Sequence, residues 1–348
     1  MIASQRSLPA LLNSWSKDLA PAYFSLVMAT GVLSLTFAAF GLQVLAFVLF
    51  AINVLFYVWL CLLTLWRLRY FRRFLYADFL DFQKGPGFFT LVAGSAVLGS
   101  QLVVLFSNYY MATALWLLGM ILWFILTYGM FSAFTIRLQK PTLEKGITGT
   151  WLLAVVATQS LATLAVLLAA EWSPLQRLEF NFVALSLWLW GGMFYIWIVV
   201  LIFYRYTFFK FDAEDLVPPY WINMGAMAIS TLTGALLIDN GQEAPYLHSL
   251  LPFLKGFTVF YWATGSWWIP LLVVLEVWRH GVQRQPIHYS PLYWGMVFPL
   301  AMYSLSTRRL AASMGLPFLQ PLALIFFALA CVAWVLVLAG MIRQASQH

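Results

Sequence analysis

Charge is the property that this sequence has least of. Only 9% of its 348 residues are charged, whereas soluble globular domains carry about 25% charged residues. Hydrophobic residues make up 63% of the chain, and the mean hydropathy is +0.86. Lipid must therefore be the main solvent of this fold, and the composition excludes a soluble globular domain.

Cysteine and histidine are also scarce, and their positions argue against the usual metal and redox sites. The two cysteines, Cys61 and Cys331, lie inside apolar runs and form no CxxC pair, so neither a disulfide framework nor a zinc site is indicated. None of the four histidines has a His or Cys partner at ligand spacing. The chain also lacks a G-x-S-x-G elbow and an acidic pair at membrane depth. We therefore expect neither an enzyme nor a bound metal or cofactor.

What the chain does have is a series of long apolar runs. A helix needs about 20 apolar residues to cross the hydrocarbon core. Residues 1–20 are expected to form a cytoplasmic N-terminal segment, residues 21–343 an all-α integral membrane domain and residues 344–348 a C-terminal tail. The runs predict ten spanning helices, near residues 22–40, 42–66, 86–106, 110–136, 147–169, 180–204, 219–238, 251–278, 290–307 and 320–342.

Basic residues predict the orientation of these spans. The 19 Lys and Arg outnumber the 12 Asp and Glu, which in a soluble protein would suggest a nucleic-acid partner. In a membrane protein, basic residues instead accumulate on the cytoplasmic side. With a cytoplasmic N-terminus, only Arg177, Lys255, Arg308 and Arg309 fall on the outer side. We therefore predict a multi-pass protein of the plasma membrane (the bacterial inner membrane) with both termini cytoplasmic and no nucleic-acid partner.

The spans alternate in character along the chain. Odd-numbered spans contain small and hydroxylated residues, as in MATGVLSLT at 28–36 and MGAMAISTLTGA at 224–235. Even-numbered spans are bulky and apolar, as in LALIFFALACVAWVLVLAG at 322–340. Small residues allow helices to approach closely, and polar residues avoid lipid. We therefore expect five hairpins, with the odd helices as an inner ring that lines a central pore and the even helices outside.

The residues expected to line this pore are neutral. Hydroxyl and amide donors can solvate an anion without a fixed countercharge, which suits rapid passage better than tight capture. The alternative is that these small and hydroxylated stretches only pack helices together, as in any membrane bundle. The candidate lining residues are Thr30, Gly31, Ser34, Gly94, Ser95, Thr158, Gln159, Ser230, Thr231 and Ser304.

Glu276, near the inner end of the eighth span, is the best candidate for a residue that couples transport to an ion. Carriers usually need a buried ionisable residue to bind or relay the coupling ion. The alternative is an interfacial carboxylate that pairs with Arg279 one turn later.

The ninth span, YWGMVFPLAMYSLST at 293–307, has a proline at its centre. Pro299 removes a backbone hydrogen bond and clashes with the carbonyl of residue 295, at a cost of about 3 kcal/mol or more. Gly295 leaves room there for the backbone to bend. A kink of this kind directs Phe298 toward the lumen, where an aromatic ring can close a narrow pore sterically and by dewetting. The alternative is a structural kink with Phe298 as ordinary packing.

The same stretch resembles the ninth-helix signature of the tellurite-resistance/dicarboxylate transporter (TehA-type) family, which includes the plant slow anion channels. PAYFSLVMATGVLS at 21–34, GPGFFTLVAGSAVLGSQ at 85–101 and PPYWINMGAMAISTLTG at 218–234 are similar to further helices of that family. The resemblance implies ten helices in five hairpins and a homotrimer with a pore in each subunit. It also implies that Phe298 occludes the pore, so Phe298, Pro299 and Gly295 form the candidate gate.

Two functions from different classes follow from these observations. The first is a passive channel for small anions such as chloride or nitrate, embedded in the lipid bilayer. The second is a secondary transporter, either a proton-coupled dicarboxylate carrier or a sulfite or tellurite exporter, in which Glu276 takes part in coupling. A receptor or scaffold that binds a ligand without moving it is less consistent with the polar lining.

Overall fold

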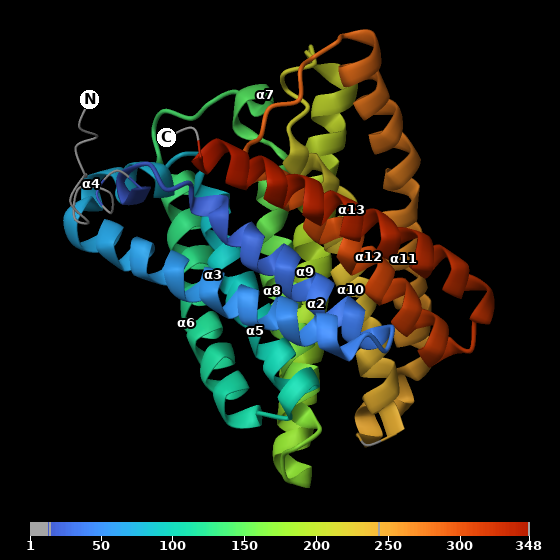
Figure 1. Ribbon diagram of the computed structural model, residues 1–348. Helices are drawn as coiled ribbons and strands as arrows, with labels where there is room; N and C mark the ends of the chain where they lie inside the picture. Colours follow the sequence, from blue (N-terminus) through green and yellow to red (C-terminus); the bar gives the residue numbers. More distant parts are fainter. Residues whose placement is uncertain (1–12, 14, 243, 347–348) are drawn as a thin grey trace.

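The computed structural model describes residues 13, 15–242 and 244–346, and these residues form helices and connecting turns without a β-strand (Figure 1). Within these described ranges, ten helices are 15 residues or longer. They are α2 (Ser25–Ala39), α3 (Gln43–Tyr70), α5 (Phe89–Phe106), α6 (Tyr109–Ile136), α8 (Leu153–Ala169), α9 (Pro174–Phe208), α10 (Ile222–Asp239), α11 (Pro245–Val277), α12 (Trp294–Met314) and α13 (Gln320–Ala345). The shorter elements are η1 (Pro21–Phe24), α4 (Arg72–Phe79), η2 (Gly85–Phe88), α7 (Leu143–Gly146), η3 (Gly149–Leu152), η4 (Pro218–Trp221), η5 (Asn240–Gln242), η6 (Trp278–Val282), η7 (Pro291–Tyr293) and η8 (Pro317–Leu319).

Nine helices of the described part of the chain are long and apolar enough to cross a membrane. They correspond to nine of the ten spans predicted from the sequence. The predicted span at 290–307 coincides with α12, which is 21 residues long and therefore extends about 31 Å. Its helix includes Arg308 and Arg309 together with Pro299 and several hydroxylated residues, so its composition is less apolar than that of the other nine. Length alone does not separate α12 from them.

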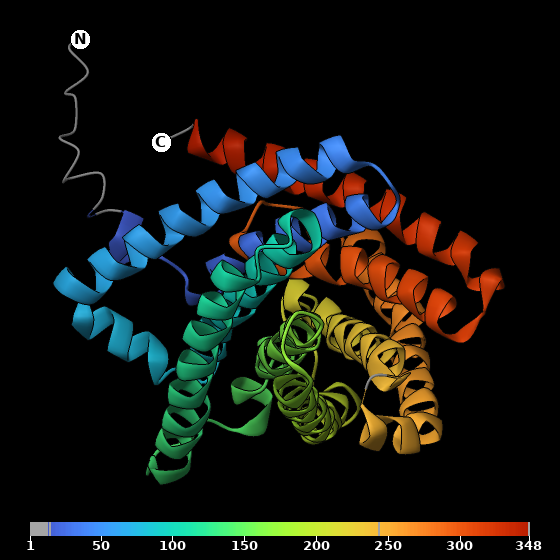
Figure 2. The same ribbon diagram turned by 90° about the horizontal axis from the view of Figure 1, so that it is seen from below.

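The long helices pack in two layers. In the inner layer, α2 contacts α5, α5 contacts α8, α8 contacts α10, α10 contacts α12, and α12 returns to α2. The first and last parts of the chain, blue and red, lie side by side in both views where this ring closes (Figures 1 and 2). Each outer helix packs on the inner helix that precedes it in the chain: α3 on α2, α6 on α5, α9 on α8, α11 on α10 and α13 on α12.

Burial separates the two layers. We compare the most apolar stretch of 18 consecutive residues in each helix. In α2, α5, α8 and α10 with their preceding turns, between 72% and 100% of this stretch is buried inside the protein. In α3, α6, α9, α11 and α13 the share is between 22% and 44%. The outer helices expose large apolar side chains such as Leu55, Ile121 and Leu336, which is the arrangement expected where lipid is the solvent.

Each inner helix begins with a short turn, and the five turns meet at one end of the molecule. The turns η1, η2, η3, η4 and η7 contact one another in a closed order that repeats the order of the helices. The inner helices therefore all run in the same direction. At their other end, Arg308 donates to the carbonyl of Ala39 over 2.8 Å and Arg309 pairs with Asp239 over 2.6 Å. In Figure 1 the connecting segments α4 and α7 lie at the upper end.

Two glycines set the spacing of these turns. A Cβ on Gly149 would lie 2.4 Å from the carbonyl oxygen of Pro219, and a Cβ on Gly87 would lie 2.8 Å from the backbone nitrogen of Ala22. Both contacts are with backbone atoms of the neighbouring turn, which a side-chain rotation cannot relieve. Only glycine fits at these two positions without a backbone shift.

The Gly149→Ala substitution should therefore destabilise the protein. Overpacking against a backbone costs about 1–3 kcal/mol, so we expect a lower melting temperature for the purified protein in detergent. Gly256→Ala is the matched control, because a Cβ on Gly256 meets nothing within 4 Å. A Gly149→Ala protein that melts at the temperature of the Gly256→Ala protein would contradict the close approach of η3 and η4.

Candidate functional site

Phe298 and Pro299 lie in the buried part of α12. Phe298 is 1% exposed and is among the largest fully buried side chains of the protein. The helix continues from Trp294 to Met314 with Pro299 inside it. It packs between α2, α10 and α13, so Phe298 belongs to the inner layer.

A glycine on the neighbouring helix accommodates the proline. A Cβ on Gly225 of α10 would lie 2.7 Å from Cγ of Pro299 and 2.9 Å from its Cβ. Gly295 is in a different situation, because the nearest atoms to its added Cβ would belong to Ile222 and Pro219 at 3.8 Å, an ordinary contact distance. Sequence reasoning missed Gly225. Its signal was the small-residue run MGAMAIS, but the sequence cannot show which residue of such a run faces the proline.

Three of the candidate lining residues hydrogen-bond to outer helices at the beginning and end of the ring. Ser34 of α2 donates to the carbonyl of Ala46 on α3 over 2.7 Å. Thr30 of α2 accepts a hydrogen bond from the indole of Trp334 on α13 over 3.0 Å. Ser304 of α12 donates to the carbonyl of Ala323 on α13 over 2.7 Å.

The same arrangement recurs on the middle inner helices. Ser95 of α5 bonds to the hydroxyl of Tyr57 on α3 over 2.9 Å. On α8, Thr158 accepts from the indole of Trp123 over 2.7 Å, and Gln159 donates to the carbonyl of Trp188 over 2.9 Å. These six side chains therefore link the inner layer to the outer layer.

The other candidate lining residues make local contacts. Ser230 and Thr231 of α10 each donate to a carbonyl of their own helix over 2.8 Å. A Cβ on Gly31 would lie 2.5 Å from Val97 on α5, and a Cβ on Gly94 would lie 3.4 Å from Val27 on α2. Both glycines therefore face the contact between α2 and α5.

A buried amide pair beside Gly31 was not foreseen. Asn53 of α3 donates to the side-chain oxygen of Gln101 on α5 over 2.7 Å, and neither residue is exposed. The remaining amide atoms, the Asn53 oxygen and the Gln101 nitrogen, have no hydrogen-bond partner among the residues that the structure describes. Asn53 lies in a bulky apolar run, and nothing in that run indicates a contact with an inner helix.

Glu276 has different partners from the one expected. One carboxylate oxygen accepts from the indole of Trp221 over 3.0 Å, and the other lies 3.3 Å from Nε2 of His280. The alternative that paired Glu276 with Arg279 is wrong, because no ion pair joins these two side chains in the described part of the chain. The side chains of residues four apart meet on one helix face, and His280 holds that position relative to Glu276. Among the described residues, no group of three or more His, Cys, Asp or Glu could hold a metal ion.

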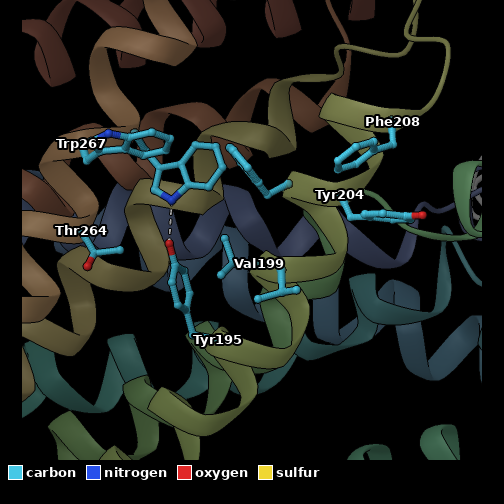
Figure 3. A pocket seen from close by; sticks show the side chains of 9 residues that line it. Tyr195, Val199, Tyr204, Phe208, Thr264 and Trp267 are labelled. Carbon is cyan, nitrogen blue, oxygen red and sulfur yellow. Dashed lines mark hydrogen bonds between the residues drawn. The ribbon is translucent and has the colours of Figure 1, made fainter.

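A cavity of about 390 Å³ opens between the outer helices α9 and α11 (Figure 3). Its walls are almost entirely apolar and include Val199, Phe208 and Trp267. Tyr195 supplies a hydroxyl, which accepts from the indole of Trp268 over 2.8 Å and donates to the carbonyl of Asn223 over 3.1 Å. The hydroxyl of Tyr195 and the indole of Trp268 satisfy each other, and the cavity lies in the outer layer, away from the candidate lining residues.

The fold defines a multi-pass helical membrane protein with a buried inner ring and an apolar outer layer. The family comparison agrees with this class and extends it. Residues 18–342 match the model of the SLAC1 family, described as voltage-dependent anion channel, and the chain belongs to this family.

Individual relatives carry general names. An uncharacterized membrane protein of Mycobacterium tuberculosis (strain H37Rv) is 33% identical over 150 residues, which cover 43% of this chain and 76% of that protein. An uncharacterized transporter of Methanocaldococcus jannaschii is 22% identical over 345 residues, 96% of each chain. The resemblance to an anion-channel and transporter family is therefore confirmed, whereas the names of these relatives state no substrate.

The hydrogen bonds between the layers lead to a prediction for Thr158. Thr158→Val keeps the side-chain shape but removes the acceptor for Trp123, so it should lower the melting temperature. A double-mutant cycle with Trp123→Phe should give a coupling energy of about 0.6 kcal/mol and at most about 1.7 kcal/mol.

Thr113→Val provides the control, because Thr113 of α6 donates only to Tyr109 of its own helix. Absence of coupling between Thr158 and Trp123, together with altered anion selectivity in Thr158→Val, would instead place this hydroxyl at a pore surface.

Proposed function

We propose that the protein is a passive channel for small anions such as chloride or nitrate. In this proposal, ten helices cross the membrane and the inner ring of α2, α5, α8, α10 and α12 encloses the pore. The observation that carries the proposal is the closed ring of parallel helices in a chain of the voltage-dependent anion channel family. Phe298 is fully buried in one helix of that ring and acts as the occluding side chain.

The chemistry of the ring suits an anion that passes without being captured. The inner helices bury many hydroxyl groups, and between residues 21 and 307 their charged side chains are confined to the last residue of α10, Asp239. An anion in such a pore has no fixed countercharge to hold it, which favours fast exit. The candidate lining residues are buried in this structure, and in the proposal they contribute the hydroxyl lone pairs, amide groups and glycine backbone that their bonds to other helices leave unused.

The candidate gate acts through helix packing. Gly225 lets the ring of Pro299 sit against α10, and this contact fixes the helix turn that carries Phe298. Gly295 supplies backbone freedom one turn earlier, where the carbonyl loses its donor. We further propose that both termini are cytoplasmic in the bacterial inner membrane and that three copies form a homotrimer, each with its own pore.

The second candidate is a secondary transporter for dicarboxylates, sulfite or tellurite. One observation favours it: Glu276 keeps a carboxylate near the inner end of α11, where it touches His280 and Trp221. The Methanocaldococcus relative is also named as a transporter. In this alternative, Glu276 takes up a proton when the substrate binds.

The channel proposal predicts a larger current in Phe298→Ala. Loss of the ring should raise the anion conductance of the purified protein in planar bilayers by about tenfold or more, because a barrier lowered by about 1.4 kcal/mol has that effect. Phe326→Ala on the outer helix α13 removes the same ring from a buried site and should leave the conductance unchanged. An unchanged current in Phe298→Ala would show that Phe298 is ordinary packing.

The channel and the transporter make opposite predictions for Glu276. If the protein is a channel, Glu276→Gln should leave the reversal potential in an anion gradient unchanged, and a pH gradient should not drive anion uptake. Uptake into proteoliposomes that follows the pH gradient and is lost in Glu276→Gln would support the coupled carrier and reject the channel.

A further inference from the structure

Five arginines end the five outer helices at the same end of the molecule, and they differ in how they are held. Arg67 of α3 pairs with Asp78 over 2.6 Å, and Arg137 after α6 donates to the carbonyl of Leu80 over 2.7 Å. Arg205 of α9 pairs with Asp215 over 3.2 Å. The guanidinium groups of Arg279 and Arg343, after α11 and in α13, have neither a hydrogen bond nor an ion pair with any residue that the structure describes.

Arg343 is one of the residues that line a cavity of about 700 Å³. This cavity lies between the segment 287–293, the first turns of α12 and the last turns of α13. Four further lining residues supply polar groups, namely His288, Tyr289, Tyr293 and Gln344. The rest of the wall is apolar.

The polar and apolar parts of the wall are ordered along α13. Ala333, Leu336 and Val337 form the apolar wall, and Arg343 and Gln344 follow towards the end of the helix. Ala333 and Arg343 are ten residues apart in the helix, which corresponds to about 15 Å along its axis. The cavity is thus long and amphipathic, with its charge at the end where the helix leaves the bilayer.

We propose that this cavity binds a phospholipid with an anionic headgroup, whose phosphate is held by Arg343 and whose acyl chain lies along α13. Guanidinium groups bind phosphate oxygens with paired, charge-assisted hydrogen bonds. Basic side chains at the cytoplasmic surface attract anionic lipids. A free inorganic anion would leave the apolar half of the cavity in contact with water, whereas an acyl chain covers it.

The position of the cavity makes a lipid the natural occupant. Leu336 is 66% exposed on the outer surface of α13, so the apolar wall is continuous with the lipid-facing side of the protein. The proposal rests on one part of the proposed function, the cytoplasmic placement of this end. It does not depend on conduction or on the role of Phe298.

A bound lipid would also touch the helix that carries the candidate gate. Met296 and Val297 line the cavity from α12, and Val297 directly precedes Phe298 in the chain. Binding should therefore stabilise the folded protein according to ligand concentration, as for any ligand of the native state. This gives a readout that is independent of current.

The test measures lipid binding to the purified full chain by native mass spectrometry, with phosphatidylglycerol and phosphatidylcholine of the same chain length. Unsubstituted protein should retain phosphatidylglycerol in preference to phosphatidylcholine. Arg343→Gln should weaken phosphatidylglycerol binding by about fivefold, the effect of one basic group near an anionic surface. Ala333→Trp should fill the apolar end and weaken the binding of both lipids.

Arg72→Gln is the matched control, because Arg72 is an exposed arginine of α4 with the same charge and lies outside the cavity. It should bind phosphatidylglycerol as the unsubstituted protein does. Equal binding by Arg343→Gln and the unsubstituted protein, or an equal loss in Arg72→Gln, would overturn the proposal.

Inorganic phosphate without lipid serves to distinguish the two sources of a phosphate group. Thermal melting of lipid-free protein should be unaffected by millimolar phosphate and should shift upwards with phosphatidylglycerol. A shift produced by phosphate alone and lost in Arg343→Gln would assign the cavity to a soluble anion and overturn the lipid proposal. Lipid-free Arg343→Gln should have the same melting temperature as the unsubstituted protein, since the substitution removes a guanidinium group that has no partner among the described residues.

Discussion

The structure depends on how closely parallel helices can approach one another. A ring of five helices closes only if neighbouring helices lie close together, and glycine permits a close approach at three contacts of this ring. Gly149 meets the backbone of Pro219, Gly225 meets the ring of Pro299, and Gly31 meets Val97. Since lipid provides no hydrophobic drive for helix association, van der Waals contact at short range must supply much of the attraction within the ring.

The outer layer is attached to the ring largely through tryptophan indoles. Trp123 of α6, Trp188 of α9, Trp262 of α11 and Trp334 of α13 each donate an N–H to an inner helix. An indole offers a large apolar surface with one donor at its edge. It can therefore pack against apolar side chains with most of its surface, as the buried Trp123 and Trp188 do, and still satisfy a polar group at the boundary between the layers. The serines and threonines of the ring are the counterparts of these donors.

Much of this arrangement was predictable from sequence, because lipid imposes a simple rule on composition. The length of the apolar runs predicted all nine helices of the described residues that are long and apolar enough to span a membrane. The division into helices with small residues and helices with bulky residues matches the division into buried and exposed helices. The direction of individual side chains was not predictable. Ser34 and Thr158 have hydroxyls that could bond to an ion, to their own helix or to a neighbour, and only the position of Ala46 or Trp123 decides between these partners. Glu276 could likewise reach a residue three or four positions later, and the helix geometry at its end favoured His280.

The common direction of the inner helices has an electrical consequence. In an antiparallel bundle the helix dipoles largely cancel, but in this ring they point the same way, because all five helices begin at the end where η1, η2, η3, η4 and η7 meet. Each helix start is equivalent to about half a positive charge. The ring therefore has a built-in polarity along its axis that needs no ionised side chain, so that pH and the protonation of neighbouring residues leave it unchanged.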